Sequence, residues 1–189
     1  MAKSGHIFQV TANTQESKDK AFANRVLKVN HAGENGAIHI YAGQILLARV
    51  TAPSLVKELK KFKTHEERHR AIFNAEPQSR HMPRCRSYWL CAAGGLMLGI
   101  ITGLFGQRAI AATTVAVERV VLSHLKKQLT MLLGRDEAAV AAIREIVDEE
   151  QRHHDVSASH LNAGQFWPRL LTPIVSASTE SVIWLGMRL

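Results

Sequence analysis

Apolar residues recur at steps of three or four along four stretches of this chain, which is the spacing of one face of an amphipathic α-helix. Few segments alternate apolar and polar residues with a period of two, so strands are not expected. The pattern predicts an all-α fold with four amphipathic helices around one core. The apolar positions of the four stripes are Leu27, Ile38, Tyr41 and Ile45; Leu55, Leu59, Phe62 and Phe73; Val115, Leu122, Leu125, Leu129 and Leu132; and Ile143, Val147 and Leu161.

Turn-forming residues mark the expected helix ends. Pro53 suits the first turn of a helix, Gly134 suits a helix end, and Asp136 suits an N-cap. The expected elements are a flexible arm over residues 1–13, a first helix from near 14–17 to about 50, a second to about 79, a third to about 133, a fourth from about 136, and one or two terminal helices over 168–189.

Two copies of one carboxylate and histidine pattern lie within the four stripes. In each copy a lone glutamate precedes a Glu-x-x-His pair by 32 residues (66 − 34 and 150 − 118), and the copies are offset by 84 residues (118 − 34, 150 − 66 and 153 − 69). One Glu from each of two helices and a Glu-x-x-His pair from each of two others are the ligands of ferritin-like di-iron bundles. The offset predicts one domain over residues 14–189 that contains two pseudo-repeats, at about 17–80 and 101–164. The candidate metal ligands are Glu34, Glu66, His69, Glu118, Glu150 and His153.

An alternative interpretation treats the four glutamates as surface charges at helical spacing. Four carboxylates in core stripes need a counter-charge, because an unpaired buried carboxylate is strongly destabilising. Two Fe(II) ions balance four negative charges when the two imidazoles coordinate as neutral groups, and manganese would do the same. In the polar segment 148–155, the constant offset selects Glu150 and His153 rather than Glu149 and His154.

Residues 87–107 form an apolar stretch without a charged side chain. A helix of this length would just cross a bilayer core, but a single crossing would put the two halves of the metal site on opposite sides of the membrane. We therefore expect a crossover helix that lies in the membrane interface or packs over the bundle, with a buried core helix of a soluble protein as the remaining alternative. Gly95, Gly99 and Gly103 lie four apart and predict close packing against a neighbouring helix.

Composition and charge narrow the class of protein. The chain has 189 residues, 46% of them hydrophobic, which suffices for one domain with a sizeable core. Lys and Arg total 24 against 16 Asp and Glu, but no nucleic-acid-binding motif accompanies this net charge of +8. Arg80, Arg84 and Arg86, just before the apolar stretch, suit an anionic membrane surface. Two cysteines without a zinc pattern are expected to be reduced, and the absence of a signal peptide or presequence favours a bacterial protein or a mature fragment.

Four strings make this sequence resemble the demethoxyubiquinone hydroxylase family. They are NHAGENGAIHIYAGQ at 30–44, EERH at 66–69, TTVAVE at 113–118 and DEEQRHHD at 148–155. The resemblance covers nearly the whole chain from about residue 25 onward. One departure is His39, where members of that family usually have an arginine.

The resemblance implies a non-haem di-iron monooxygenase of ubiquinone biosynthesis, which uses O₂ to hydroxylate the ring of a polyprenyl demethoxyubiquinol. It implies that Glu66 and Glu150 bridge two iron ions, that Glu34 and Glu118 are terminal ligands, and that an external reductant supplies electrons. It also implies a peripheral protein of the inner membrane, on the cytoplasmic side in bacteria or the matrix side in mitochondria. A lipid-presenting or reductase partner protein is compatible with this function, and nucleic acid is not an expected partner.

Three other functions remain open: a ferritin-like oxidase or peroxidase, a di-iron quinol oxidase, and a non-enzymatic helical module stapled by metal. The chain has no G-x-G-x-x-G fingerprint for a nicotinamide nucleotide. Asn30, Tyr41 and His124 are candidates for contacts with the ligands or the substrate. The histidines expected to be surface residues or bystanders are His31, His65, His154 and His160.

Overall fold

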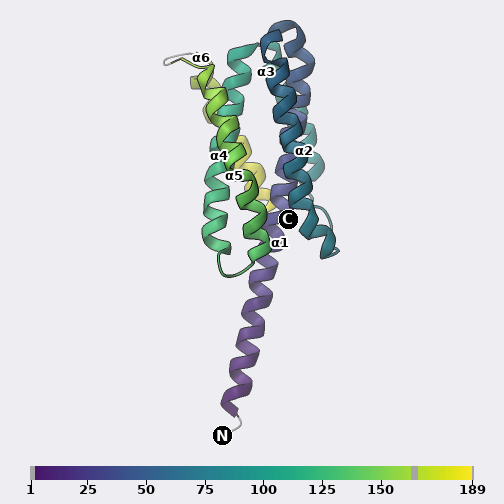
Figure 1. The fold of residues 1–189 in the computed structure, drawn as a ribbon, viewed down its shortest axis with the longest axis vertical. Helices are drawn as coiled ribbons and strands as arrows, with labels where there is room; N and C mark the ends of the chain where they lie inside the picture. The colour runs from purple at the N-terminus through teal and green to yellow at the C-terminus, as the bar shows by residue number, and fades with distance from the viewer. Residues whose placement is uncertain (1–2, 163–165, 189) are drawn as a thin grey trace.

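The computed structural model describes residues 3–162 and 166–188, with side chains from residue 14 onward. The described residues form α-helices, with one short 3₁₀ turn at Pro53–Leu55, and contain no strand. This confirms the predicted all-α fold class. The helices are α1 (Lys3–Thr51), α2 (Val56–Ser79), α3 (Tyr88–Leu104), α4 (Gln107–Leu132), α5 (Glu137–Ser159) and α6 (Phe166–Gly186) (Figure 1).

Helices α1, α2, α4 and α5 form a four-helix bundle, consistent with the ferritin-like architecture, and two further helices lie along it. α3 packs along α1, and α6 packs along α4 (Figure 1). Two apolar clusters fill the bundle at different levels. One contains Leu27, Phe73 and Ile143, and the other contains Ile45 and Phe62. The candidate metal ligands lie between these two levels.

The turn between α4 and α5 matches the sequence expectation. Gly134 has a φ of 72°, a left-handed conformation that suits glycine. Asp136 then caps α5, since its side chain accepts a hydrogen bond from the backbone nitrogen of Ala139 at 3.0 Å. Arg80 at the end of α2 donates to both oxygens of Asp136, at 2.9 and 3.2 Å, which joins this turn to the other half of the bundle.

The first helix begins earlier than the sequence suggested. α1 starts at Lys3 rather than near residues 14–17, and its first part extends past the ends of the other helices (Figure 1). Once a helix is nucleated, each added residue contributes a hydrogen bond without a new nucleation cost, so a helix can extend beyond its packed part. The flexibility of residues 1–13 and the division into two pseudo-repeats stay predictions, and residues 163–164 of the second repeat lie outside the described residues.

The apolar stretch forms a helix that packs closely on the bundle, as its glycines predicted. A Cβ atom added at Gly99 would lie 2.1 Å from the carbonyl oxygen of Ile40, and one at Gly95 would lie 2.3 Å from that of Gly36. Only glycine permits α1 and α3 to approach this closely. α3 ends at Leu104, and none of the helices in the described ranges is both long and apolar enough to cross a membrane. The terminal segment is a single helix with Pro173 inside it, while Leu189 lies outside the described residues.

Candidate metal centre

The structure brings all six candidate ligands together in the middle of the bundle. α1 carries Glu34, α4 carries Glu118, and α2 and α5 each carry a Glu-x-x-His pair one helical turn long. Each of the six side chains is at most 6% exposed. The interpretation of these glutamates as surface charges is therefore wrong, because the periodic stripes place them in the core.

Two groups of four residues within this cluster have the geometry of a metal site. Position A is formed by Glu34, Glu66, His69 and Glu150, and position B by Glu66, Glu118, Glu150 and His153; within each group one ligand atom per residue lies within 4.8 Å of the others. Glu66 and Glu150 belong to both positions, and we call them the shared carboxylates. Three carboxylates and one imidazole at each position are a donor set suited to iron or manganese.

The inward-facing atoms of the cluster have no aligned hydrogen-bond partner. This holds for Nδ1 of both histidines, both carboxylate oxygens of Glu150 and Oε1 of Glu66. The same atoms crowd together: His69 Nδ1 lies 2.9 Å from Glu150 Oε1, and His153 Nδ1 lies 3.0 Å from Glu66 Oε1. Buried polar atoms without hydrogen bonds are rare, and cations between them would satisfy all of them. The residues present therefore fit a pair of metal ions.

The charge balance of the cluster leads to the same conclusion. Burial raises the pKa of Glu34 and of Glu118, and the charges of the shared carboxylates raise both further. Burial lowers the pKa of His69 and His153, but contact with the shared carboxylates outweighs it and raises these pKa values to about 10 and about 9. The cluster thus attracts positive charge to its centre. Divalent cations would supply that charge and leave the imidazoles neutral, as metal coordination requires.

Two residues that the sequence interpretation passed over contact the outer nitrogens of the histidines. His69 Nε2 lies 2.9 Å from Oε2 of Glu149, and His153 Nε2 lies 3.0 Å from Nδ1 of His65. The expectation that His65 is a bystander is therefore wrong. The constant offset contained the signal, because Glu149 lies 84 residues after His65 (149 − 65) and each directly precedes the Glu of a Glu-x-x-His pair.

Glu149 is held as a carboxylate by its neighbours. Burial raises its pKa, but hydrogen bonds with Arg68 and His69 outweigh this effect and lower the pKa to about 2. Arg68 Nη2 donates to Glu149 Oε2 at 2.7 Å and Arg68 Nη1 donates to Glu145 at 3.2 Å. A chain of hydrogen bonds therefore links His69 to the outer surface between α2 and α5.

The three other candidate residues occupy different places. Tyr41 is buried, and its hydroxyl donates to Oε1 of Glu118 at 3.2 Å. Asn30 exchanges two hydrogen bonds with Gln128, and Nε2 of His124 contacts Glu180 at 2.8 Å, so neither contacts a candidate ligand through these bonds. Both nevertheless line the cavity described next.

His31 was expected to be a surface residue or a bystander, and the structure rules out only the surface position. It is buried against the ring of Tyr88, with ring centroids 5.0 Å apart, rather than exposed at the surface. Burial, together with the charges of Arg70 and Arg84, lowers the pKa of His31 to about 4. The imidazole is therefore neutral and packs as part of the core between α1 and α3.

An apolar cavity of about 540 Å³ leads from the surface to the carboxylates of the cluster. Helices α1, α3, α4 and α6 form its walls, and it reaches Glu34 and Glu118 as well as the shared carboxylates. α3 and α6 approach each other near their ends: the rings of Phe105 and Trp167 lie 4.8 Å apart, and Ile183 packs on an apolar cluster that includes Tyr88 and Cys91. The exposed lining residues on these two helices are Leu90, Gly94, Met97, Ile101, Ile174 and Ser178. The cavity therefore opens sideways between α3 and α6.

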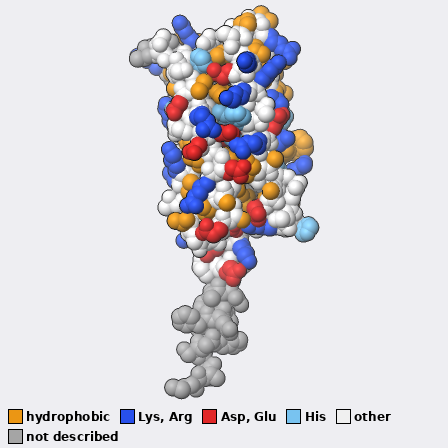
Figure 2. All heavy atoms as spheres, viewed as in Figure 1, with side chains coloured by type: hydrophobic (Ala, Val, Ile, Leu, Met, Phe, Trp, Pro, Cys, Tyr) orange, Lys and Arg blue, Asp and Glu red, His pale blue; other side chains and the backbone are white. Residues whose placement is uncertain are grey.

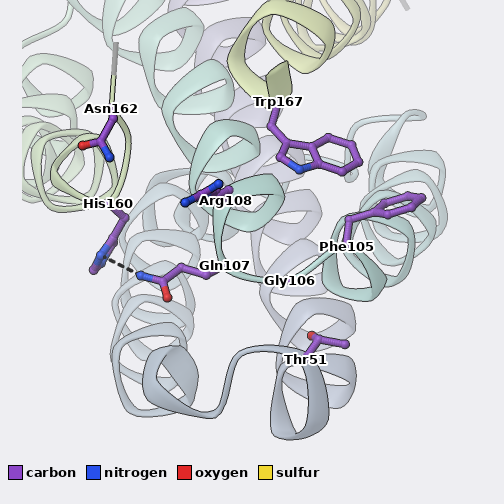
Figure 3. Close-up of a pocket in the computed structure, with 8 residues that line it drawn as sticks. All are labelled: Thr51, Phe105, Gly106, Gln107, Arg108, His160, Asn162 and Trp167. Atoms are coloured by element: carbon purple, nitrogen blue, oxygen red, sulfur yellow. Dashed lines mark hydrogen bonds between the residues drawn. The ribbon is translucent and has the colours of Figure 1, made fainter. Parts of the chain in front are cut away.

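A second cavity, also of about 540 Å³, lies at the end of the bundle where α3 turns into α4 (Figure 3). Gln107 and His160 contact each other across it at 3.3 Å, while Arg108 and Trp167 lie on its wall (Figure 3). None of its lining residues is a candidate metal ligand. Of the two, the apolar cavity is the one that reaches the candidate ligands.

Comparison with known proteins identifies relatives over most of the chain. Residues 21–186 match the protein family described as Ubiquinone biosynthesis protein COQ7. The chain is 32% identical to the mouse NADPH-dependent 3-demethoxyubiquinone 3-hydroxylase, mitochondrial, over 93% of this chain and 82% of the mouse protein. It is 33% identical to the 3-demethoxyubiquinol 3-hydroxylase of Rhodospirillum rubrum, over 89% and 79% of the two chains. The 5-demethoxyubiquinone hydroxylase, mitochondrial, of Saccharomyces cerevisiae is 28% identical over the same two shares.

Proposed function

This chain belongs to the COQ7 family of ubiquinone biosynthesis proteins, and we propose that it is a di-iron monooxygenase that hydroxylates the ring of a demethoxyubiquinol with O₂. The observation that carries this proposal is the apolar cavity that ends on four buried carboxylates. A ferritin-like oxidase of small ions would have no use for such a cavity. The named activities of the mouse and Rhodospirillum rubrum relatives are in accord with this assignment.

The metal centre would be held by the residues of positions A and B. Glu66 and Glu150 would contribute to both positions, and two iron ions held there would supply the activation of O₂ for transfer of one oxygen atom to the ring. Glu34 and Glu118 would be terminal ligands, and Tyr41 would hold Glu118 in place through the hydrogen bond at 3.2 Å. The six ligands come from four separate helices, so the packed bundle fixes the distance between them before any metal binds.

The substrate would lie along the apolar cavity, with its ring against the carboxylates and its polyprenyl tail leaving between α3 and α6. Apolar walls from Val117, Val121 and Ile183 exclude water from the ring. The opening is lateral, so a long tail does not need to fit inside the cavity. Its exit lies between two helices whose outer faces are themselves apolar.

The reaction needs two electrons from outside the cluster. Insertion of one oxygen atom into a ring C–H bond, with the second oxygen leaving as water, consumes O₂, two electrons and two protons. We assign the electrons to NADPH, which the name of the mouse relative gives as its reductant, acting directly or through a reductase.

The outer faces of α3 and α6 would rest on a membrane. Trp89, Met97, Phe166 and Trp184 are each more than half exposed on these helices, although apolar side chains of this size are usually buried. The exposed arginines near the ends of the two helices suit anionic headgroups: Arg84, Arg86, Arg108, Arg169 and Arg188. A tail emerging between α3 and α6 would then enter the lipid directly. We assign the protein to the inner-membrane surface, cytoplasmic in a bacterium or facing the matrix in a mitochondrion.

Mass spectrometry under ¹⁸O₂ tests the proposed reaction. Iron-loaded protein, a chemical reductant and a short-tailed demethoxyubiquinol should give a ring that carries one ¹⁸O atom. The Glu118→Ala variant should give none. Oxygen consumption with an unlabelled ring would instead identify a quinol oxidase, and the hydroxylase proposal would fall.

Cosedimentation with lipid vesicles tests the membrane assignment. The double variant Trp89→Ser, Trp184→Ser should bind anionic vesicles at least tenfold more weakly, since burial of even one large apolar side chain contributes roughly 1.5–3 kcal/mol and about 1.4 kcal/mol is tenfold. Neither tryptophan lines the cavity. Leu133→Ser, an exposed apolar position in the α4–α5 turn, is the matched control and should bind normally. Equal binding by both variants would contradict the assignment.

A further inference from the structure

The two metal positions are chemically unequal, and we infer that position A binds its metal ion more tightly than position B. The groups that would touch the metals do not explain a difference, because each position has three carboxylates and one histidine. The difference lies one contact further out, in the partners of those histidines and carboxylates. This inference rests on the proposed metal centre and adds to it an order of metal binding.

The histidine of position A has an anionic partner. His69 directs Nδ1 toward the cluster, so Nε2 carries the proton and donates it to Glu149 Oε2 at 2.9 Å. Arg68 fixes that carboxylate at 2.7 Å, and the side chain of Glu149 is 19% exposed. A carboxylate that accepts from the outer nitrogen of an imidazole increases the basicity of the inner nitrogen and orients the ring. His69 is therefore the stronger donor to a metal ion.

The histidine of position B has a neutral partner. His153 directs Nδ1 toward Glu66, and its Nε2 lies 3.0 Å from Nδ1 of His65. With metal on the inner nitrogen, the outer N–H must donate, so His65 accepts through Nδ1 and carries its own proton on Nε2. Glu149 Oε2 lies 3.7 Å from His65 Nδ1, which is longer than a hydrogen bond. A neutral imidazole polarises His153 less than a carboxylate polarises His69.

The terminal carboxylates differ in the same direction. Tyr41 donates a hydrogen bond to Glu118 of position B, which withdraws electron density from that ligand. The residue 84 positions after Tyr41 is Leu125 (125 − 41), which has no hydroxyl to offer Glu34. The internal repeat is broken twice, by Glu149 in place of His65 and by Leu125 in place of Tyr41. Both differences make the ligands of position A more electron-rich than those of position B. The sequence repeat supplies equal ligands, while the residues beside them differ.

Ordered uptake of iron is the measurable consequence. Loss of a partner that supports a metal ligand typically costs about 10–100-fold in metal affinity. We therefore expect the metal-free full chain to take up Fe(II) under nitrogen in two calorimetric steps that differ by roughly that factor. Mössbauer spectra should show one quadrupole doublet when ⁵⁷Fe is the first equivalent and another when ⁵⁷Fe is the second.

Two substitutions should move the steps in opposite ways. Glu149→Gln keeps the shape of the side chain and removes its charge, so it should weaken the first step by about 10–100-fold and leave the second unchanged. His65→Glu gives position B an anionic partner and should tighten the second step. The control is Glu145→Gln, which removes another partner of Arg68 but no contact to a candidate ligand, and should change neither step. Thermal unfolding verifies that each variant is folded.

Several results would overturn the inference. These are uptake of both irons in one step with identical spectra, an equal effect of Glu149→Gln on both steps, or an unchanged second step in His65→Glu. The proposed function fails separately. If the unaltered chain binds no iron, the proposed metal centre is wrong. If it binds two equivalent iron ions and gives a labelled ring product, only the proposed difference between positions A and B is wrong.

Discussion

The two sides of the metal centre have opposite chemistry. On the side of α2 and α5, His65, Arg68 and Glu149 surround the ligand histidines, and acidic and basic side chains are interspersed over that face of the molecule (Figure 2). On the side of α3 and α6, the approach to the same carboxylates is an apolar cavity with exposed apolar residues at its mouth. One side therefore holds the ligands and connects them to water, while the other admits an apolar molecule and excludes water.

This contrast explains why the chain needs six helices for a four-helix metal site. A four-helix bundle alone would expose the cluster to solvent wherever its helices separate. α3 and α6 cover that side with apolar surface. The low dielectric there would strengthen each polar contact to a substrate ring bound in the cavity. Four predictions test the contrast, from the largest expected effect to the smallest.

Removal of a shared carboxylate should abolish both iron binding and hydroxylation. Glu150→Ala deletes a proposed ligand of positions A and B, so hydroxylation should fall to the level of the protein-free reaction, and bound iron should fall well below that of the unaltered chain. Metal analysis and ¹⁸O incorporation measure these effects. Glu145→Ala, on the same helix but at the surface, should retain both iron and activity. Persistent hydroxylation in Glu150→Ala would show that the reaction does not depend on the cluster.

A side chain at the α1–α3 contact should destabilise the fold. In Gly99→Val the new Cβ would lie 2.1 Å from the Ile40 carbonyl oxygen, so the helices must separate, at a cost of about 1–3 kcal/mol or more. Thermal unfolding should show a lowered Tm by several degrees. Gly94→Ala on the same helix meets nothing within 4 Å and should be neutral or slightly stabilising. Equal Tm values for the two variants would contradict the close packing.

The sequence predicted the features that follow from regular spacing along a helix. Helical periodicity and the constant offset identified Glu34, Glu66, Glu118 and Glu150 as buried, because a stripe of apolar neighbours fixes which face of a helix enters the core. The spacing of the glycines likewise predicted the close packing of α3, since a small-residue face is a local property of one helix.

The parts that depend on contacts between different helices were not predictable in this way. Glu149 and His65 lie beside the stripes, and only the packing of α2 against α5 brings each to a ligand of the opposite helix. The cavity has the same origin, because side chains from α1, α3, α4 and α6 together form its walls. A local pattern shows which face is buried, but not which side chain from another helix will meet it.

Narrowing of the cavity mouth should weaken the binding of long-tailed substrates more than that of tailless ones. Gly94 lines the opening, and a Cβ there meets no atom within 4 Å, so Gly94→Leu should fill space without disturbing the packing. We expect KM for a long-tailed demethoxyubiquinol to rise by about tenfold, equivalent to about 1.4 kcal/mol, while a tailless analogue is spared. Ala93→Leu, the exposed neighbour outside the lining, is the matched control. An equal loss for both substrates would place the tail elsewhere.

Loss of the Tyr41 hydroxyl should have the smallest effect, and it tests whether the two sides are coupled through one ligand. Tyr41→Phe keeps the ring, which packs 5.8 Å from that of Phe62, and removes only the hydrogen bond to Glu118. A typical hydrogen bond contributes about 0.5–1.5 kcal/mol, so turnover should fall by roughly 2–10-fold without loss of iron. Tyr88→Phe, whose ring packs on His31 instead, should retain full turnover. Because Glu118 is both a proposed ligand and part of the cavity wall, a fall in kcat at unchanged KM would show that the hydroxyl orients the metal ligand. A rise in KM alone would assign the hydroxyl to substrate binding.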